Sequence, residues 1–202
     1  MKKSDIQKEK ILKAAQDLFA EKGFEATTTR EINRTVGISD GSLYYYFPDG
    51  KKQILDMIVE KGMVHREKSI SQVTIKVESL ADLEQQIMDI YDSICEIFSD
   101  EDGYRAFMIT IRERAILSNE QSKWISQVLT RIKQLLMTSI DTIKSQIRIS
   151  ADDVSTLADL IIAILQRSIY EELLIKNKKT IGLDVKEATI AQVHLFIKLI
   201  SK

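Results

Sequence analysis

The chain has 202 residues, 44% of them apolar and 29% charged, with a formal net charge of −1. This composition fits one or two small globular domains with a sizeable hydrophobic core. One proline and seven glycines leave little room for the many turns of an all-β fold. The single cysteine, Cys95, excludes an internal disulfide framework and fits a reducing cytosol. No apolar run approaches the ~20 residues of a membrane-spanning helix, and the polar start MKKSDIQKEK lacks a signal region, so we expect a cytoplasmic protein outside the membrane.

Charge is only slightly uneven along the chain. Residues 1–52 hold ten Lys and Arg against eight Asp and Glu, and the remainder holds nineteen against twenty-two. DNA would therefore have to be bound through individually placed side chains, because no bulk positive field is present.

A first amphipathic helix is predicted from Ser4 to Gly23. Ser4 and Gln7 have the spacing of a capping box at its start, and Gly23 ends it. Between them, apolar side chains recur with a period of about 3.6 residues, at Ile11, Leu12, Ala15, Leu18 and Phe19.

Residues 27–52 are the most informative segment. Thr28 and Glu31 form a second capping-box pattern, which predicts that a short helix begins there and runs to Val36. Gly37 then stands where the end of a helix favours a left-handed backbone.

A second short helix is predicted after this glycine. Ser39 is placed to cap it, and Asp40 lies in its first turn, where a negative charge suits the helix dipole. Leu43 and Phe47 share one face that packs inward, and Pro48, the only proline, ends the helix. Two short helices joined by a glycine turn indicate a helix-turn-helix, whose second helix enters the major groove of double-stranded DNA.

The stretches EKILKAAQDLFAEKGFEATTTREI and GISDGSLYYYFPDGKKQIL resemble the TetR (tetracycline-repressor) family of bacterial transcription regulators over residues 5–60. The resemblance implies an all-α fold: an N-terminal three-helix DNA-binding domain with a helix-turn-helix, and a C-terminal helical domain for dimerisation and inducer binding. Three positions depart from the family pattern. Asn33 stands in place of the usual alanine, and Asp40 in place of a residue that is often basic. The turn DGK is one residue longer than the commonest version, so Lys51 takes the place of the family's lysine.

The remainder of the chain is also expected to be helical. A fourth helix runs from about Lys51 to Ser69, and SQVTIKVESL after it is interpreted as a connecting loop, with a short strand at VTIKV as the alternative. Apolar periodicity predicts further helices over residues 80–98, 103–117, 119–147, 151–177 and 185–200. We expect a helix-turn-helix DNA-binding domain at residues 1–52 and a helical ligand-binding and dimerisation domain at residues 53–202.

Two of these helices are apolar on more than one side. LADLIIAILQ at residues 157–166 is apolar almost all round, and TIAQVHLFIKLI at residues 189–200 is similarly rich. Such helices can contact their own domain core on one side and a partner chain on the other. A homodimer joined by two helices from each subunit is therefore expected, with simple core burial as the alternative.

The side chains expected to contact DNA lie in and around the two short helices. They are Thr28, Ser39, Asp40, Gly41, Ser42, Tyr44, Tyr45 and Lys51. The four consecutive aromatic residues 44–47 cannot all face one way. We therefore expect Tyr45 to be exposed and Tyr44 to touch phosphate, while Tyr46 is left open between packing and contact.

Two of these assignments have alternatives. Asp40 can only accept a hydrogen bond from DNA, for example from a cytosine amine, and a pure helix-dipole role is its alternative. Lys51 is assigned to phosphate together with Lys52, and a solvated start of a helix is the alternative.

An effector site is expected in the second domain. Tyr91 and Trp124 combine apolar rings with a polar group, and with Phe107 and Tyr170 they are the candidate ligand-binding residues. Core packing is the alternative for each of them. Arg112 and Arg114 are further basic residues of this domain. A basic side chain that turned inward would suit an acidic or acyl ligand, and a solvated surface position is the alternative.

No catalytic or metal site is expected. His65 and His194 are isolated, and no cluster of His, Cys and Asp has metal-ligand spacing, so we expect no cofactor and no enzyme activity. The sequence predicts a homodimeric repressor that an unknown small molecule releases from its DNA operator. A DNA-associated adaptor controlled by a protein partner is the alternative, and a structural helical dimer is a third.

Overall fold

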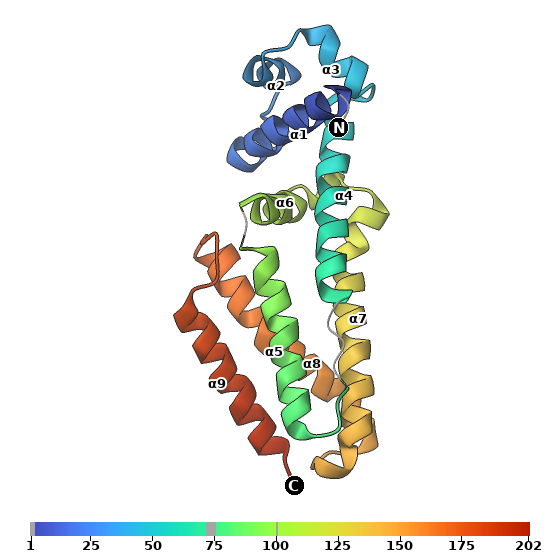
Figure 1. The fold of residues 1–202 in the computed structure, drawn as a ribbon, viewed down its shortest axis with the longest axis vertical. Coiled ribbons are helices and arrows are strands. Elements are labelled where there is room, and N and C mark those ends of the chain that lie inside the picture. The colour runs from blue at the N-terminus through green and yellow to red at the C-terminus, as the bar shows by residue number, and fades with distance from the viewer. Residues whose placement is uncertain (1–2, 72–75, 100) are drawn as a thin grey trace. The chain divides into compact units, whose positions relative to one another are not determined.

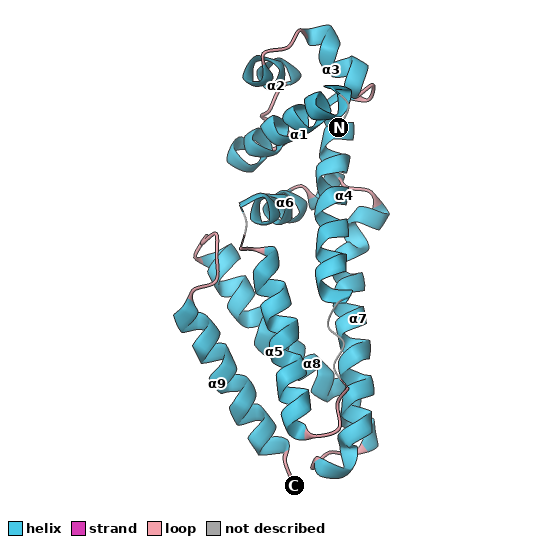
Figure 2. Ribbon diagram, in the orientation of Figure 1, coloured by secondary structure: helices cyan, strands magenta, loops and turns pink. Residues whose placement is uncertain are grey.

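The computed structural model describes residues 3–71, 76–99 and 101–202. Figures 1 and 2 show helices joined by loops. The helices are α1 (Lys3–Lys22), α2 (Thr29–Val36), α3 (Asp40–Tyr46), α4 (Gly50–Ser71), α5 (Leu80–Ile97), α6 (Glu101–Arg112), α7 (Asn119–Ile143), α8 (Val154–Ile169) and α9 (Leu183–Ile200). Within the described ranges the only β-structure is one isolated bridge between Ile147 and Ser201. The prediction of an all-α fold is confirmed.

The chain divides into two compact units. The first comprises residues 1–65 and 102–123, and the second comprises residues 66–101 and 124–202. Helix α6 therefore belongs to the same unit as α1–α3, although it follows α5 in the sequence. This division does not coincide with a boundary after residue 52, because α4 and α6 both contribute to the core of the first unit. The functional division at residue 52 stays a prediction.

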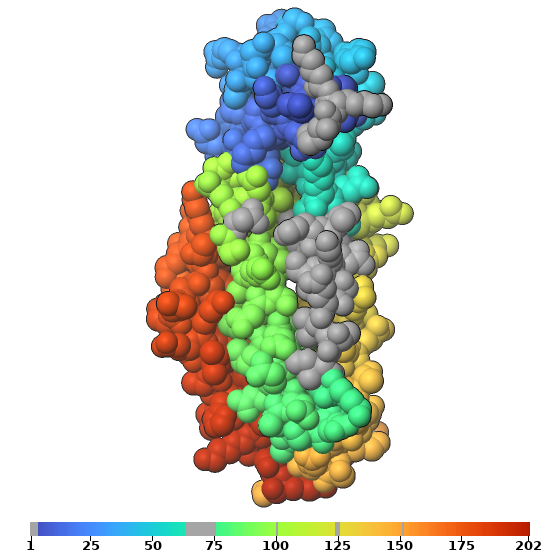
Figure 3. Space-filling view, viewed as in Figure 1, coloured from blue at the N-terminus to red at the C-terminus, as the bar shows by residue number. Residues whose placement is uncertain are grey.

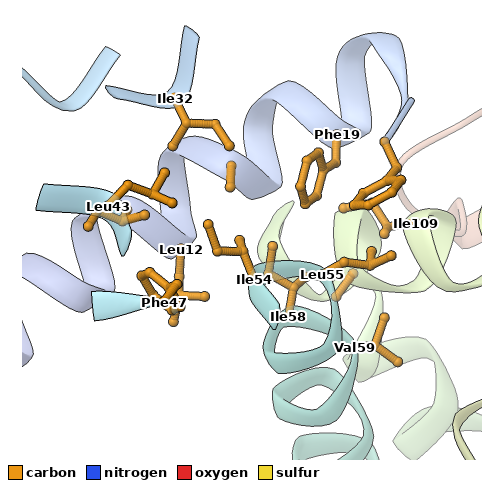
Figure 4. Close-up of a cluster of buried hydrophobic side chains, with 14 residues drawn as sticks. Leu12, Phe19, Ile32, Leu43, Phe47, Ile54, Leu55, Ile58, Val59 and Ile109 are labelled. Atoms are coloured by element: carbon orange, nitrogen blue, oxygen red, sulfur yellow. The ribbon is translucent and has the colours of Figure 1, made fainter. Parts of the chain in front are cut away.

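One cluster of apolar side chains forms the core of the first unit. Figure 4 shows side chains from α1, α2, α4 and α6 pointing toward one another, together with two from α3 and its end. They include Leu12, Phe19, Ile32, Leu43, Phe47, Ile54, Leu55, Ile58, Val59 and Ile109. The buried residues that α1, α4 and α6 contribute recur three or four positions apart, which is the spacing of one helix face. The short helices α2 and α3 are thus held by tertiary burial, since helices of this length are marginal alone.

A buried tyrosine joins three helices of the second unit. Helices α5, α8 and α9 pack against one another. The hydroxyl of Tyr91 in α5 lies 2.8 Å from Oγ of Ser168 in α8 and 3.3 Å from Oγ1 of Thr189 in α9. All three residues are buried, so each hydroxyl has a partner inside the unit.

Several helix ends differ from the prediction. The non-α segments are 3₁₀ helices at Arg114–Ile116, Lys144–Gln146 and Ala151–Asp153 and a π-helical segment at Tyr170–Ile175. Unbroken helices over residues 103–117, 119–147 and 151–177 were therefore a wrong prediction at these ends. Apolar spacing differs little between the three windings over one turn, so the pattern did not reveal them.

The start of the first helix also differs from the prediction. The first helix begins at Lys3, so Ser4 lies inside it and does not cap it, contrary to the prediction.

Residues 72–75, in the middle of the predicted connecting loop, lie outside the described residues. None of the described helices is long and apolar enough to span a membrane.

Candidate nucleic-acid interface and effector region

Both predicted end signals of α2 are present. Thr28 Oγ1 accepts from the backbone N–H of Glu31 at 3.2 Å, and the Glu31 carboxylate accepts from the Thr28 N–H at 2.9 Å. Gly37 closes the helix with φ of 74°, and its N–H donates to the Asn33 carbonyl at 2.8 Å. A left-handed backbone at this point is accessible to glycine without strain. The capping box and the glycine turn are confirmed.

The pH dependence of the melting temperature should reveal how much the ionised Glu31 of this capping box stabilises the fold. A hydrogen bond from Lys22 and two from Thr28 lower the pKa of Glu31 from 4.5 to about 2. Because the folded pKa is depressed, the stabilisation is present above the unfolded pKa and is lost as pH falls toward the folded pKa. Glu31→Gln removes the charge and retains an acceptor. We expect its melting temperature to lie below that of the wild type near neutral pH and to match it near pH 2.

Thermal melting followed by circular dichroism between these pH values checks this prediction. Glu25→Gln is the matched control, because Glu25 is exposed and lies outside the capping box, in the turn that precedes α2. Its difference from the wild type should not change with pH. A constant difference for Glu31→Gln over the whole range would contradict the assignment.

Helix α3 begins at Asp40, with Ser39 in the N-cap position as predicted. The Ser39 side chain makes no hydrogen bond to a backbone amide of the helix. Its Oγ lies 2.8 Å from Oγ of Ser42 instead. The predicted side-chain cap is therefore wrong, because the hydroxyl three residues further on takes its place as the partner.

The first turn of α3 is tied to α2 through a side-chain pair. Asn33 Nδ2 donates to Asp40 Oδ1 at 2.9 Å. Asn33 is only 2% exposed, whereas Asp40 lies at the surface. The two residues that depart from the family pattern thus contact each other. The sequence pattern identifies both residues but does not predict their pairing.

The two faces of α3 differ in burial, as the residue pattern predicted. Leu43 and Phe47 are fully buried, whereas Tyr45 is 78% exposed and Tyr44 is 51% exposed. Tyr46 is half-buried and packs against the core, with its ring edge-on to that of Tyr45 at 5.0 Å between centroids. The expected exposure of Tyr45 is confirmed, and Tyr46 serves packing.

Lys51 is turned into its own unit. Its Nζ donates to the carbonyls of Phe24 at 2.7 Å and Thr27 at 2.9 Å, with the Glu25 carbonyl at 3.5 Å. The ammonium also lies 4.2 Å from the centroid of the Phe24 ring. An ammonium has three N–H donors, and these carbonyls occupy them. The assignment of Lys51 to phosphate therefore stays a prediction, and the structure supplies a second role that the sequence did not indicate. Lys52 pairs with Asp56 one turn along α4.

Residues at the end of α6 also form hydrogen bonds to the turn between α1 and α2. Arg112 Nη1 donates to the Ala20 carbonyl at 3.2 Å, and the Glu113 carboxylate accepts from the Phe24 N–H at 3.1 Å. Gly23 has φ of 92°, and a Cβ placed there would collide with the Arg112 guanidinium. Arg112 thus contacts this turn. A separation of 89 residues hid the contact between Phe24 and Glu113 from sequence analysis.

The predicted ligand-binding residues with described side chains belong to both units and differ in burial. Tyr91 is buried in the second unit with its hydroxyl bonded to protein, whereas Phe107 is half-buried in α6 of the first unit. Tyr170 is 57% exposed, and the side chain of Trp124 lies outside the described residues. Their common assignment to one pocket rested on residue type, which does not reveal the direction of a side chain. It stays untested.

A surface groove of about 680 Å³ lies along α5 and the start of α9. Its lining includes Asp89, Asp92, Ser93, Cys95, Glu96 and Lys186. Lys186 and Asp92 form an ion pair at 3.2 Å. Burial raises the pKa of the Cys95 thiol to about 11, so the thiol is neutral and a poor nucleophile near neutral pH.

Among the described residues of the second unit, Gln86 is the side chain with both amide atoms buried and unsatisfied. It lies in α5 with no exposed surface, and neither atom of its amide has a hydrogen-bond partner among the described residues. A buried amide without partners destabilises a protein unless a guest molecule completes it. Gln86 is therefore the strongest candidate for a polar contact to an internal water or an effector. No motif in the sequence marks this residue.

Gln86→Leu should raise the free energy of unfolding of the ligand-free protein by about 1 kcal/mol or more, because it removes an unpaired buried amide. Chemical denaturation measures this change. Gln85→Leu is the matched control, since Gln85 is exposed and only pairs with Asp89. A loss of stability in Gln86→Leu alone would show that a bound molecule satisfies the amide in the purified protein.

Comparison with known proteins finds a family match for part of the first unit. Residues 11–58 match the family model described as bacterial regulatory proteins, tetR family. The chain is 30% identical over 135 residues to the HTH-type transcriptional repressor KstR2 of Rhodococcus jostii, covering 63% of this chain and 60% of that protein. It is 45% identical over 53 residues to IcaR, the negative transcriptional regulator of the biofilm operon icaADBC in Staphylococcus aureus, covering 26% and 28%.

These relatives are matched over less than two thirds of their own length, whereas the fold is matched throughout. The structure of the ketosteroid transcriptional regulator KstR2 of Mycobacterium tuberculosis aligns with 96% of this chain and 95% of its own, with a TM-score of 0.64 and 18% identity. An alignment of 135 residues extends beyond the helix-turn-helix into the rest of the chain. The capping box, the glycine turn and most of the core under α3 lie inside residues 11–58, the segment of this chain that matches the tetR family of bacterial regulatory proteins.

Proposed function

We propose that this protein is a DNA-binding transcription regulator, a repressor that leaves its operator when a small molecule binds the second unit. The observation that carries the proposal is the division of α3 into two faces. Leu43 and Phe47 anchor it in the core, while Tyr44 and Tyr45 are exposed on the other side. Exposed aromatic side chains on an anchored helix suit insertion into a major groove. KstR2 and IcaR, which resemble this chain, are named as a repressor and a negative regulator.

A mobility-shift experiment tests DNA binding. The wild-type protein should retard duplexes from the region that flanks its own coding sequence. Gly41→Ala is the informative variant, because a Cβ at Gly41 meets nothing within 4 Å in the free protein. The substitution should leave the melting temperature unchanged or raise it, and it should weaken DNA binding where the backbone of α3 approaches the bases. Failure of the folded wild-type protein to retard any such fragment at low salt would overturn the proposal.

The second unit is proposed to form the homodimer. Four apolar side chains of α8 and α9 are exposed, to between 44% and 69%. They are Leu160, Ile190, Leu195 and Leu199. In Figure 3 the outer side of α9, in red, lies at the surface of the second unit. A second copy of the chain would bury these side chains and present two α3 helices to major grooves about 34 Å apart, or a multiple of it.

The second unit is also proposed to bind the effector, with Gln86 as a polar contact. Two segments could transmit a conformational change in the second unit to the DNA-binding helices. Helix α4 begins just after α3 and crosses the boundary between the units at residue 65, and α6 is joined at both ends to helices of the second unit. A ligand that prefers one arrangement of these segments would change DNA affinity by roughly 5–150-fold, the usual range of allosteric coupling.

The effector proposal is tested with a compound library in two assays. Compounds that raise the melting temperature should also lower DNA affinity, and Gln86→Leu should weaken both effects. DNA binding that ignores every stabilising compound would favour the adaptor controlled by a protein partner.

A further inference from the structure

The helix-turn-helix contains an acidic side chain whose position is set by a buried amide. Asn33 Nδ2 donates to Asp40 Oδ1 at 2.9 Å. The direction of this bond is unambiguous, because a carboxylate can only accept. We propose that Asp40 reads a cytosine in the operator and that Asn33 is the positioning residue that holds its carboxylate for this contact. The inference rests on the proposed DNA-binding function.

The pair leaves one carboxylate oxygen available. Among the described residues, Oδ2 of Asp40 has no hydrogen-bond donor and no cationic partner. Asp40 is exposed and lies in the first turn of α3, one residue before Gly41 and on the helix that carries Tyr44 and Tyr45. The free oxygen therefore belongs to the same short helix as the proposed DNA-contacting side chains.

The chemistry of DNA restricts what this oxygen can contact. Phosphates and the acceptor atoms of guanine repel a carboxylate, so only exocyclic amines in the major groove remain. Cytosine presents its N4 amine there with no acceptor on the same base, whereas the N6 amine of adenine lies beside the acceptor N7. An acceptor without a donor beside it therefore favours cytosine over adenine.

The arrangement around Asn33 has a structural disadvantage that argues for a role in binding. Asn33 is 2% exposed, and its Oδ1 has no hydrogen-bond partner among the described residues. An alanine at this position would avoid the unpaired acceptor. The bond to Asp40 is the only hydrogen bond of this amide among the described residues, and holding that carboxylate in one rotamer reduces the entropy lost when a base binds.

The test is a selection of binding sites from a randomised duplex library, followed by affinity measurements at one fixed salt concentration. For the wild-type chain we expect one position in each half-site to favour cytosine over the other bases by roughly tenfold. Asp40→Ala should reduce this discrimination to within about twofold and leave the other positions unchanged. Asp40→Asn adds an N–H donor beside the remaining acceptor oxygen, so the preference at the same position should move toward adenine, whose N6 amine and N7 acceptor match a side-chain amide.

The role of Asn33 is tested by coupling. Asn33→Ala should weaken the cytosine preference without shifting it to another base. The double variant of Asn33→Ala with Asp40→Ala should show the same base preference as Asp40→Ala alone, because Asn33 acts on the base only through Asp40. A merely structural role for Asn33 would instead lower affinity equally at every position of the site. Melting temperatures of all variants verify that each is folded.

Three outcomes would overturn the inference. The first is an unchanged base preference in both Asp40 variants. The second is a uniform gain of affinity for all sequences in Asp40→Ala, which would show that Asp40 only repels the phosphate backbone. The third is a selection in which the folded wild-type chain enriches no sequence. That result would overturn the proposed function itself, whereas the first two would leave it standing.

Discussion

Leu195→Arg should convert the protein into a monomer and lower its DNA affinity by about 10²–10⁴-fold, the contribution expected when two linked binding events become independent. Leu195 lies in α9 and is 56% exposed in the single chain, beside Leu199 at 69%. In the proposed dimer the same position is buried against the partner. A guanidinium there would be desolvated without a counter-ion, which strongly destabilises an interface.

Light scattering coupled to gel filtration measures the oligomeric state, and a mobility shift measures affinity. The fold of the single chain should be retained, because the substituted side chain is exposed within it. Ile116→Arg is the matched control, since Ile116 is an exposed isoleucine of the first unit, at 37%. A dimer that survives Leu195→Arg with unchanged DNA affinity would place the interface elsewhere.

Lys51→Ala should lower the free energy of unfolding by about 2 kcal/mol, because it leaves backbone carbonyls of the turn between α1 and α2 without a charged donor. Nζ of Lys51 donates to the carbonyls of Phe24 and Thr27 at 2.7 and 2.9 Å. The alanine also loses the contact of the ammonium with the Phe24 ring, at 4.2 Å from its centroid.

Stability and salt dependence together separate the two roles of Lys51. If the ammonium serves the fold, the variant melts earlier and the slope of log affinity against log salt is unchanged for the folded protein. If the ammonium contacts phosphate, the slope falls by about one. Lys52→Ala is the control for stability, because its ion pair with Asp56 is exposed and contributes at most about 1 kcal/mol. An unchanged stability in Lys51→Ala with a reduced slope would restore the phosphate assignment.

Local signals in the sequence predicted the helix-turn-helix well. The capping box of Thr28 and Glu31, the left-handed Gly37 and the inward pair of Leu43 and Phe47 are all present. Each depends on residues three or four positions apart, whose contact follows from helix geometry alone. The same locality explains the errors. Ser39 meets a hydroxyl in place of a backbone amide, because two partners compete within the same turn.

The candidate sites were predicted by residue type and place in the motif, which does not determine where a long side chain points. Lys51 has the position of a phosphate ligand and binds three carbonyls of its own unit. Arg112 was considered for an acyl ligand and contacts the turn after α1. Gln86 carries no motif, and its unsatisfied amide becomes apparent only when its burial is known.

The sequence by itself determined the all-α fold, the position of the helix-turn-helix and the face of α3 that is buried, because these follow from short-range periodicity and capping. Tertiary structure decided the partners of side chains between helices. It grouped α6 with the DNA-binding helices, turned Lys51 inward and placed Asn33 against Asp40. Some of these contacts join residues 89 or more positions apart, and others lie across a turn between two helices. They exist only after the chain has closed around a common core.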